Sequence, residues 1–297
     1  MSPRSVLSAV LVAAFVLVSA SPSSAQPKTE LNKCVPADLR DDAISFEAED
    51  GVELPGLVFG SGSSGVLLAH TQTEFLCDWL PLARQLAEDG HQVLVYEMRS
   101  MMLRENRHRY DLDVLGAAKE LDSRGASSIV AGGGGTGATA IATAAAKIPS
   151  LKGMFLLTPF KTFQTSSSDL DAVAGIGTVQ VPSFIAAAQD DVIELGDSEL
   201  QDVRLADHAR QIADAATNAK LQIVPGKAQS AELTDDPAMR DEVRAFVRES
   251  SPPPTFLERW WLPIGGGVLV LALVIAGVVV LRRKRSATTG QDVSAGS

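Results

Sequence analysis

The sequence predicts an α/β fold, with a mostly parallel central sheet covered by helices on both faces. Two observations predict this class. Between residues 43 and 249, short apolar segments alternate with segments whose apolar residues recur at helical spacing. The central short segments are apolar along both faces, which is typical of parallel strands buried on two sides. Glycine and proline punctuate the boundaries between these segments.

The elements are expected in alternating order. Residues 43–51 and 52–62 indicate two strands joined by a turn at Asp50-Gly51, an antiparallel start to the sheet. Residues 77–90 repeat apolar side chains at helical spacing and stop at Gly90. We expect further strands at 65–70, 91–98, 127–132, 152–159, 181–189 and 220–226, and further helices at 111–125, 138–148, 199–218 and 236–249. Residues 161–180 leave room for only a small lid.

The N-terminus resembles a secretory signal peptide. Arg4 precedes an apolar stretch over residues 6–18, and small residues at Ser23 and Ala25 follow. We expect residues 1–25 to be removed between Ala25 and Gln26. An uncleaved anchor is the alternative, but the apolar stretch is shorter than the ~20 residues that a membrane span needs.

The C-terminus has the pattern of a membrane anchor. Residues 260–281 carry no charge, and Trp260 and Trp261 stand where an interfacial aromatic belt belongs. Basic residues 282–285 follow at once, so the positive-inside rule places the tail, 282–297, in the cytoplasm. Such a clean charge boundary disfavours a buried core helix. Residues 251–259 indicate a Pro-rich stalk, which leaves 26–250 as the extracytoplasmic domain of a single-pass cell-membrane protein.

The extracytoplasmic part is acidic. Five of the 26 basic residues and one of the 36 acidic residues lie outside residues 26–259, which leaves this segment with a net charge of −14. Such a charge argues against nucleic acid as a partner and against binding to an anionic lipid surface. The expected membrane contact is the C-terminal anchor alone.

The chain has two cysteines, Cys34 and Cys77. Outside the membrane they can form a disulfide, worth roughly 3–4 kcal/mol by the loop-entropy argument. The alternative is a free Cys34 and a Cys77 buried as a small apolar residue. Neither the two cysteines nor the four histidines have the spacing of metal ligands, so we expect no metal and no cofactor.

The stretch 127–147, "SSIVAGGGGTGATAIATAAAK", raises the functional question. An apolar strand meets four glycines and continues as an alanine-rich helix. Enzymes present a nucleophile or cradle a phosphate on such a turn. Here the turn contains no Ser, Cys, Asp or Lys.

Several motifs in order resemble the α/β-hydrolase family, of the dienelactone-hydrolase-like kind. They are "GVLLAH", "DWLPLARQLAEDGHQVLVYEMRS", "DLDVLGAAKELDSRGASSIVAGGGGTGATAIATAAA", "VPSFIAAAQDDVIE" and "IVPGKAQSAELTDDPAMRDEVRAFV", and the resemblance covers residues 43–249. It implies an α/β-hydrolase fold. It also implies a serine on the Gly-x-Ser-x-Gly turn, followed by an acid and a histidine that takes the serine proton.

This sequence departs from that pattern at two of the three positions. The resemblance assigns Gly135 to the nucleophile position, Asp191 to the acid and Gln229 to the base, so only the acid remains. "RSMMLRENRHRY" also replaces the family's Arg-Gly-x-Gly-x-Ser stretch. Since a nucleophile turn needs a positive φ that only glycine adopts without steric cost, Gly135 indicates a turn kept after its chemistry was lost.

Other residues near this turn remain candidates. His70, Thr71 and Thr136 are candidates to line a ligand pocket, although a histidine at position 70 is commonly structural in the family. The Thr136 side chain is expected to point away from the reacting position. His208 lies in a patterned helix and is more simply a packing residue, and Cys77 does not lie on the turn.

Two further sequence patterns suggest functions other than that of a hydrolase-fold domain. Gly132, Gly134 and Gly137 match G-x-G-x-x-G, the dinucleotide fingerprint, but the next strand ends without the required acid. The turn is not a Walker-type phosphate loop either, since no Lys-Ser/Thr follows. The basic cluster 104–110 suggests contact with an anion or a partner, or else a solvated helix start.

The sequence therefore favours a catalytically inactive hydrolase-fold domain that binds a small molecule or protein, or acts as a scaffold, at the cell envelope. A hydrolase with relocated catalytic groups and a nucleotide-binding module are the alternatives.

Overall fold

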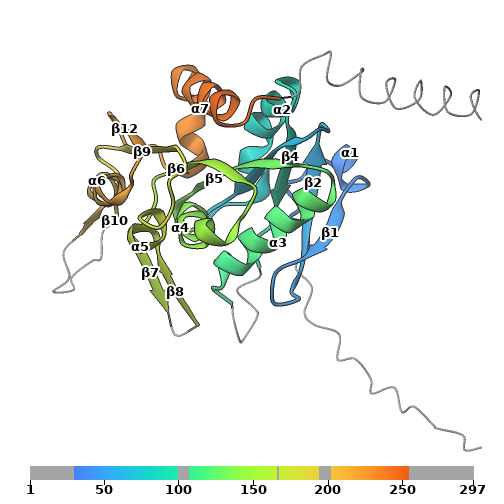
Figure 1. The fold of residues 1–297 in the computed structure, drawn as a ribbon, viewed down its shortest axis with the longest axis horizontal. Helices are drawn as coiled ribbons and strands as arrows, with labels where there is room; N and C mark the ends of the chain where they lie inside the picture. The colour runs from blue at the N-terminus through green and yellow to red at the C-terminus, as the bar shows by residue number, and fades with distance from the viewer. Residues whose placement is uncertain (1–29, 100–106, 166, 194–201, 254–297) are drawn as a thin grey trace, which may run out of the picture.

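The structure is a computed structural model that describes residues 30–99, 107–165, 167–193 and 202–253. Its centre is an eight-stranded sheet with the order β1-β2-β4-β3-β5-β6-β9-β12 (Figure 1). β2 runs antiparallel to both its neighbours, and the other pairs are parallel. The strands are β1 (Ile44–Glu47), β2 (Glu53–Phe59), β3 (Ser64–Ala69), β4 (Gln92–Tyr96), β5 (Ser128–Gly134), β6 (Leu151–Leu157), β9 (Ser183–Ala188) and β12 (Ala219–Val224). The expected antiparallel start and parallel centre are confirmed.

Helices cover both faces of the sheet (Figure 1). They are α1 (Ala37–Arg40), α2 (Leu80–Glu88), α3 (Tyr110–Ser123), α4 (Gly135–Ala144), α5 (Ala172–Ile176), α6 (Leu205–Ala215) and α7 (Pro237–Ser250), with short 3₁₀ turns η1 (Leu76–Trp79), η2 (Ala145–Lys147) and η3 (Ser230–Asp235). Two small ribbons pair β7 (Thr162–Thr165) with β8 (Ser168–Asp171) and β10 (Val192–Ile193) with β11 (Val203–Arg204).

Each central strand contributes to two hydrophobic cores. On β3, Val66 and Leu68 pack with α2 and α7, whereas Leu67 and Ala69 pack with α3 and α4. Successive side chains of a strand point to opposite faces, so a strand that is apolar throughout buries both.

Two helices begin later than expected. The helix expected at 77–90 opens with the 3₁₀ turn η1, and α2 starts at Leu80 with Pro81 in its first turn. Proline has no N–H to donate and suits the first turn of a helix. The helix expected at 199–218 starts at Leu205, because residues 203–204 pair with β10 instead.

The predicted membrane-related segments lie outside the described residues. These are the signal peptide 1–25, the span 260–281, the tail 282–297 and the stalk beyond residue 253. Among the residues that the structure does describe, no helix has the length and apolar character to cross a bilayer.

Candidate functional site

The glycine-rich turn lies at the carboxyl end of β5, where α4 begins. Gly135 has a φ of 51°, in the left-handed region that favours glycine. A Cβ atom at this position would overlap the hydroxyl of Thr71, which lies on the loop after β3. The backbone conformation therefore favours glycine, and the lack of space requires it, at the position that the resemblance assigns to a nucleophile.

The preceding glycine is also required by a close neighbour. A Cβ atom on Gly134 would overlap the hydroxyl of Ser230. Two positions earlier in the chain, a Cβ atom on Gly132 would overlap the Phe155 ring. The space directly beside Gly134 and Gly132 is thus filled by protein atoms.

The hydroxyls of two threonines accept hydrogen bonds from the backbone N–H groups beside the turn. In a hydrolase, the N–H of the residue after the nucleophile and an N–H from the loop after β3 hold the oxyanion. Here the N–H of Thr136 donates to Oγ1 of Thr71 at 3.3 Å, and the N–H of Gln72 donates to Oγ1 of Thr136 at 3.0 Å. The two hydroxyls lie 3.2 Å apart. Both donors are thus already bonded within the protein.

The fold brings the acid and base positions together. Asp191 follows β9, Gln229 follows β12, and Nε2 of Gln229 donates to Oδ1 of Asp191. Asp191 is 1% exposed, and its Oδ2 has no hydrogen-bond partner within the described part of the chain. Burial raises the pKa of Asp191 to about 6; the bond from Gln229 opposes this shift and the charge of Glu232 adds to it. A glutamine amide does not titrate, so it cannot take a proton from a hydroxyl.

The structure adds a pair that the sequence did not reveal. Oγ of Ser230 donates to Oε2 of Glu74 at 2.7 Å, and burial raises the pKa of Glu74. Ser230 has a φ of 48°, uncommon for a residue with a side chain, and its N–H donates to Oγ1 of Thr158 at 2.9 Å. The two partners are 156 positions apart, so no sequence pattern joins them.

A pocket of about 280 Å³ opens at this end of the sheet. Its lining residues are Thr71, Gln72, Thr73, Gly135, Thr158, Phe160, Ile193, Leu205, Gln229 and Ser230. Of the three predicted pocket residues, Thr71 lies in this lining. His70 and Thr136 lie behind it: both are buried, and Thr136 bonds to Thr71.

His70 holds the loop after β3 in place. Its Nδ1 lies 2.6 Å from the carbonyl oxygen of Thr71, and the N–H of Met98 donates to its Nε2 at 3.0 Å. Because Nε2 accepts, Nδ1 carries the proton that is donated to the carbonyl oxygen of Thr71. Oε2 of Glu97 lies 3.3 Å from Nε2. The ring therefore positions Thr71, and both of its nitrogens are in use.

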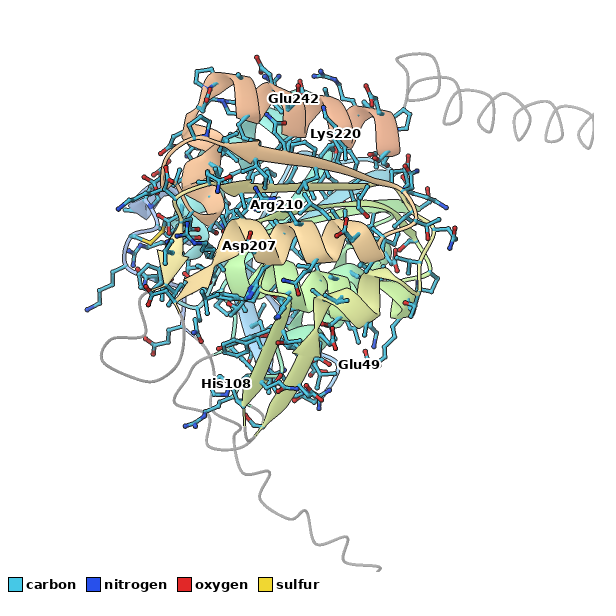
Figure 2. All side chains as sticks on the ribbon, turned by 90° about the vertical axis from the view of Figure 1, so that its left-hand side faces the viewer. Glu49, His108, Asp207, Arg210, Lys220 and Glu242 are labelled. Atoms are coloured by element: carbon cyan, nitrogen blue, oxygen red, sulfur yellow. A yellow bond between two sulfur atoms is a disulfide. The ribbon has the colours of Figure 1, made fainter. Side chains whose placement is uncertain are left out.

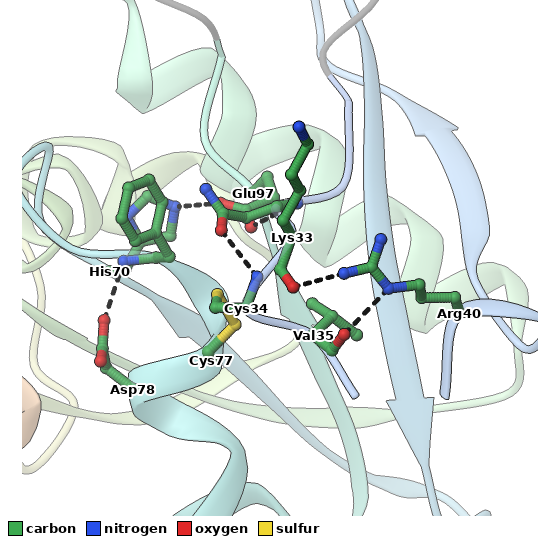
Figure 3. The surroundings of a disulfide bond; sticks show 10 residues. Lys33, Cys34, Val35, Arg40, His70, Cys77, Asp78 and Glu97 are labelled. Atoms are coloured by element: carbon green, nitrogen blue, oxygen red, sulfur yellow. Dashed lines mark hydrogen bonds and ion pairs between the residues drawn. A yellow bond between two sulfur atoms is a disulfide. The ribbon is translucent and has the colours of Figure 1, made fainter. Parts of the chain in front are cut away.

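Cys34 and Cys77 form a disulfide with their Cα atoms 6.2 Å apart (Figure 3). It ties the N-terminal segment to η1, directly after the loop that carries Thr71 and Glu74. Beside it the N–H of Asn32 donates to Oε1 of Glu97 at 3.2 Å, and Glu97 in turn contacts His70. The segment before β1 thus braces one wall of the site.

The remaining candidates lie elsewhere. Residues 104–106 of the basic cluster are outside the described residues, and Arg109 pairs with Asp111 at 2.9 Å. His208 lies on α6, where its Nδ1 accepts from the N–H of Lys161 at 3.4 Å. Other charges pair at the surface, such as Asp207 with Arg210 and Lys220 with Glu242 (Figure 2). Across the described ranges, no group of three His, Cys, Asp or Glu side chains is placed to hold a metal ion.

Arg99, which follows β4, is buried in an ion-pair network. Its guanidinium donates to Asp113 at 2.8 Å and to Asp50 at 2.8 and 2.9 Å. Arg99 therefore keeps a structural role at the start of the stretch that departs from the family pattern.

Comparison with solved structures decides the fold. An esterase from Rhodococcus sp. matches with a TM-score of 0.57 at 12% identity, over 71% of this chain and 100% of that chain. The protein has the α/β-hydrolase fold. An esterase from Pyrococcus furiosus (TM-score 0.55, 14% identity, 76% of this chain and 97% of that chain) is also similar. So is Est1E from Butyrivibrio proteoclasticus (TM-score 0.54, 13% identity, 70% and 98%).

At such identities the likeness extends to the α/β-hydrolase fold alone and not to activity. No protein-family model and no curated protein matches the chain.

Proposed function

We propose that this α/β-hydrolase-fold protein binds a ligand at the former hydrolase site and does not hydrolyse it. One observation carries the proposal: both backbone donors that would hold an oxyanion are occupied by the hydroxyls of Thr71 and Thr136. The missing hydroxyl at Gly135 and the amide at Gln229 support the same conclusion. The spaced motifs support descent from a dienelactone-hydrolase-like enzyme whose triad has degenerated.

We also propose that the domain stands outside the cell membrane, anchored by residues 260–281. The support is the sequence of the two termini, with an apolar signal-like start and basic residues 282–285 after the apolar run. The disulfide supports an oxidising compartment. The acidic net charge argues for a small molecule or a protein as partner and against nucleic acid.

A second function rests on the Ser230–Glu74 pair. A serine in a strained backbone conformation that donates to a carboxylate has features of an activated nucleophile. In that case the protein is a hydrolase with relocated groups. Against it, the pocket offers no free pair of backbone donors at the turn, and Ser230 is 1% exposed.

Ester hydrolysis separates the two functions. The full-length chain, purified in a non-ionic detergent, is assayed with short-chain activated esters beside Ser230→Ala. We expect no turnover above the detergent blank for either protein. Turnover by the parent that disappears in Ser230→Ala would establish the relocated hydrolase and refute the binding function.

A further inference from the structure

Three buried serines hold the chain after α7 against the sheet. Ser251 follows α7 and is 1% exposed. Its Oγ lies 2.8 Å from Oγ of Ser64 and 2.6 Å from Oγ of Ser128. Its carbonyl oxygen also accepts from the hydroxyl of Ser64 at 2.8 Å. The chain after α7 is therefore fixed to the first residues of β3 and β5.

Pro253, the last described residue, continues this attachment. A Cβ atom on Gly90, which lies just before β4, would stand 3.2 Å from Cβ of Pro253, so the two residues are in close contact. Figure 1 shows the end of the described chain beside α2, which precedes Gly90. Since β3, β4 and β5 run parallel, their first residues lie on one edge of the sheet, the amino edge. The chain thus leaves the described fold at the amino edge.

The pocket lies at the other end of the same strands. Thr71 follows β3 and Gly135 follows β5, and both residues line the pocket. Seven positions separate Ser64 from Thr71, and seven separate Ser128 from Gly135. Because a strand rises about 3.3 Å per residue, about 23 Å of sheet lies between the serine cluster and the base of the pocket.

The proposed membrane anchor begins a short distance after Pro253. Residues 254–259, the tether, separate Pro253 from the apolar run 260–281. A chain spans at most about 3.3–3.6 Å per residue, so the path from Pro253 to Trp260 covers at most about 25 Å. To bring the pocket mouth against the bilayer, the tether would have to pass around the domain, along the length of β5 and beyond the loops at its end. That path is longer than the reach of the tether.

We propose that the anchored domain stands with the amino edge of its sheet toward the bilayer and its pocket toward the water. The ligand of the pocket is then a water-soluble molecule of the space outside the membrane, and not a lipid of the bilayer. This inference rests on the proposed anchor. The serine cluster fixes where the chain leaves the domain, and the short tether fixes which edge of the sheet meets the membrane.

The test places one fluorescent label at each end of β3. Ser63→Cys lies at the amino edge and Thr73→Cys at the pocket, and both positions are exposed. Because Cys34 and Cys77 are bonded, a maleimide dye reacts only with the new thiol when no reductant is present. The full-length protein is placed in nanodiscs of phosphatidylcholine, with an acceptor dye on some of the lipid headgroups. This lipid has no net charge, so it neither attracts nor repels the acidic domain.

We expect energy transfer to the lipid dye to be greater from position 63 than from position 73, because the two labels stand at different heights above the bilayer. Equal transfer from the two positions, or greater transfer from position 73, overturns the proposal.

A longer tether tests the cause of the orientation. Twenty Gly/Ser residues inserted between Thr255 and Phe256 add an average span of about 25 Å, which lets the domain turn, so the difference between the two positions should shrink. The same insert after Ser297 is the matched control and should leave the difference unchanged. A difference that keeps its full size with the longer tether shows that the tether does not set the orientation, and this also overturns the proposal.

The same preparations separate failure of the orientation from failure of the anchor. Labelled protein that does not elute with the nanodiscs refutes the anchor and the orientation with it. Protein that elutes with the nanodiscs and transfers equally from both positions refutes the orientation alone. Neither result bears on hydrolysis, which the ester assay decides.

Discussion

Thr71 shows how one side chain changes what a fold can do. Its hydroxyl accepts from the N–H of Thr136 and occupies the space beside Gly135 where a nucleophile's Cβ would stand. In the proposed function, this hydroxyl of the protein takes the place of a substrate oxygen. His70 keeps Thr71 there by bonding to its carbonyl oxygen.

We expect Gly135→Ala to destabilise the protein by about 2–5 kcal/mol. A left-handed backbone costs an alanine about 1–2 kcal/mol, and the overlap with Thr71 adds about 1–3. Gly125→Ala is the matched control, since Gly125 has a φ of 96° and no atom within 4 Å of an added Cβ, so only the backbone cost applies. Unfolding in urea measures both free energies. Equal losses in the two variants would show that Thr71 does not crowd position 135.

Sequence reasoning reached some of these residues and not others. Gly135, Asp191 and Gln229 were found because the family resemblance assigns a triad position to each, and the motifs that carry it follow strands visible as apolar runs. Ser230 and Glu74 were not found, since their pairing depends on how two loops meet in space. The role of Thr71 depends on the same loop geometry.

At the scale of elements, the buried polar cluster at the opposite end of the sheet joins three segments. Nδ1 of His91, just before β4, lies 2.8 Å from Oγ of Ser64, which donates to the carbonyl of Ser251 after α7 at 2.8 Å. His91 is fully buried, and its Nε2 has no partner within the described residues. Burial lowers the pKa of His91, Asp89 opposes the shift and Arg248 adds to it.

We expect the stability of the protein to fall in acid through His91. Since the pKa of His91 is lower in the folded protein than in the unfolded chain, the unfolded chain binds the proton more readily. The free energy of unfolding therefore decreases as the pH falls from 6.5 through the lowered pKa of the folded state. The slope from one such group is at most about 1.4 kcal/mol per pH unit. His91→Gln cannot take up a proton, so the difference in unfolding free energy between parent and variant should shrink as pH falls. A constant difference would contradict this assignment.

Most elements followed from the sequence because apolar runs and helical spacing reflect burial directly. The β7–β8 ribbon did not, since its strands are short and largely polar, and no apolar alternation marks them. The start of α6 was placed too early because the periodicity of residues 199–204 does not reveal that residues 203–204 pair with β10. Local patterns report burial, and they do not report which neighbour a short segment bonds to.

At the scale of the whole molecule, the disulfide and the sequences of the two terminal segments support the same proposed location of the domain, outside the cell membrane. The bond between Cys34 and Cys77 is typical of an oxidising compartment, and we propose that residues 260–281 anchor the chain in the membrane. In that proposed location the site faces the cell exterior or periplasm.

We expect a membrane-impermeant maleimide to leave the full-length protein unlabelled on intact cells or spheroplasts. Labelling should appear after mild reduction, because Cys34 and Cys77 are the two cysteines of the chain and both are bonded. Cys34→Ser with Cys77→Ser is the control and should remain unlabelled under both conditions. Labelling that appears only after lysis, and without any reductant, would place the domain in the cytoplasm with free thiols.

The central claim is that a hydrolase turn persists here with its oxyanion position closed by Thr71. Its most direct test is ester hydrolysis by Gly135→Ser/Gln229→His with and without Thr71→Gly. Thr71→Gly removes the overlap with a serine at position 135 and frees the N–H of Thr136, and one such donor is worth about 10²–10³ in rate. We predict that the parent and the double variant are inert and that the triple variant hydrolyses the ester. A double variant as active as the triple, or turnover by the parent, would contradict the account.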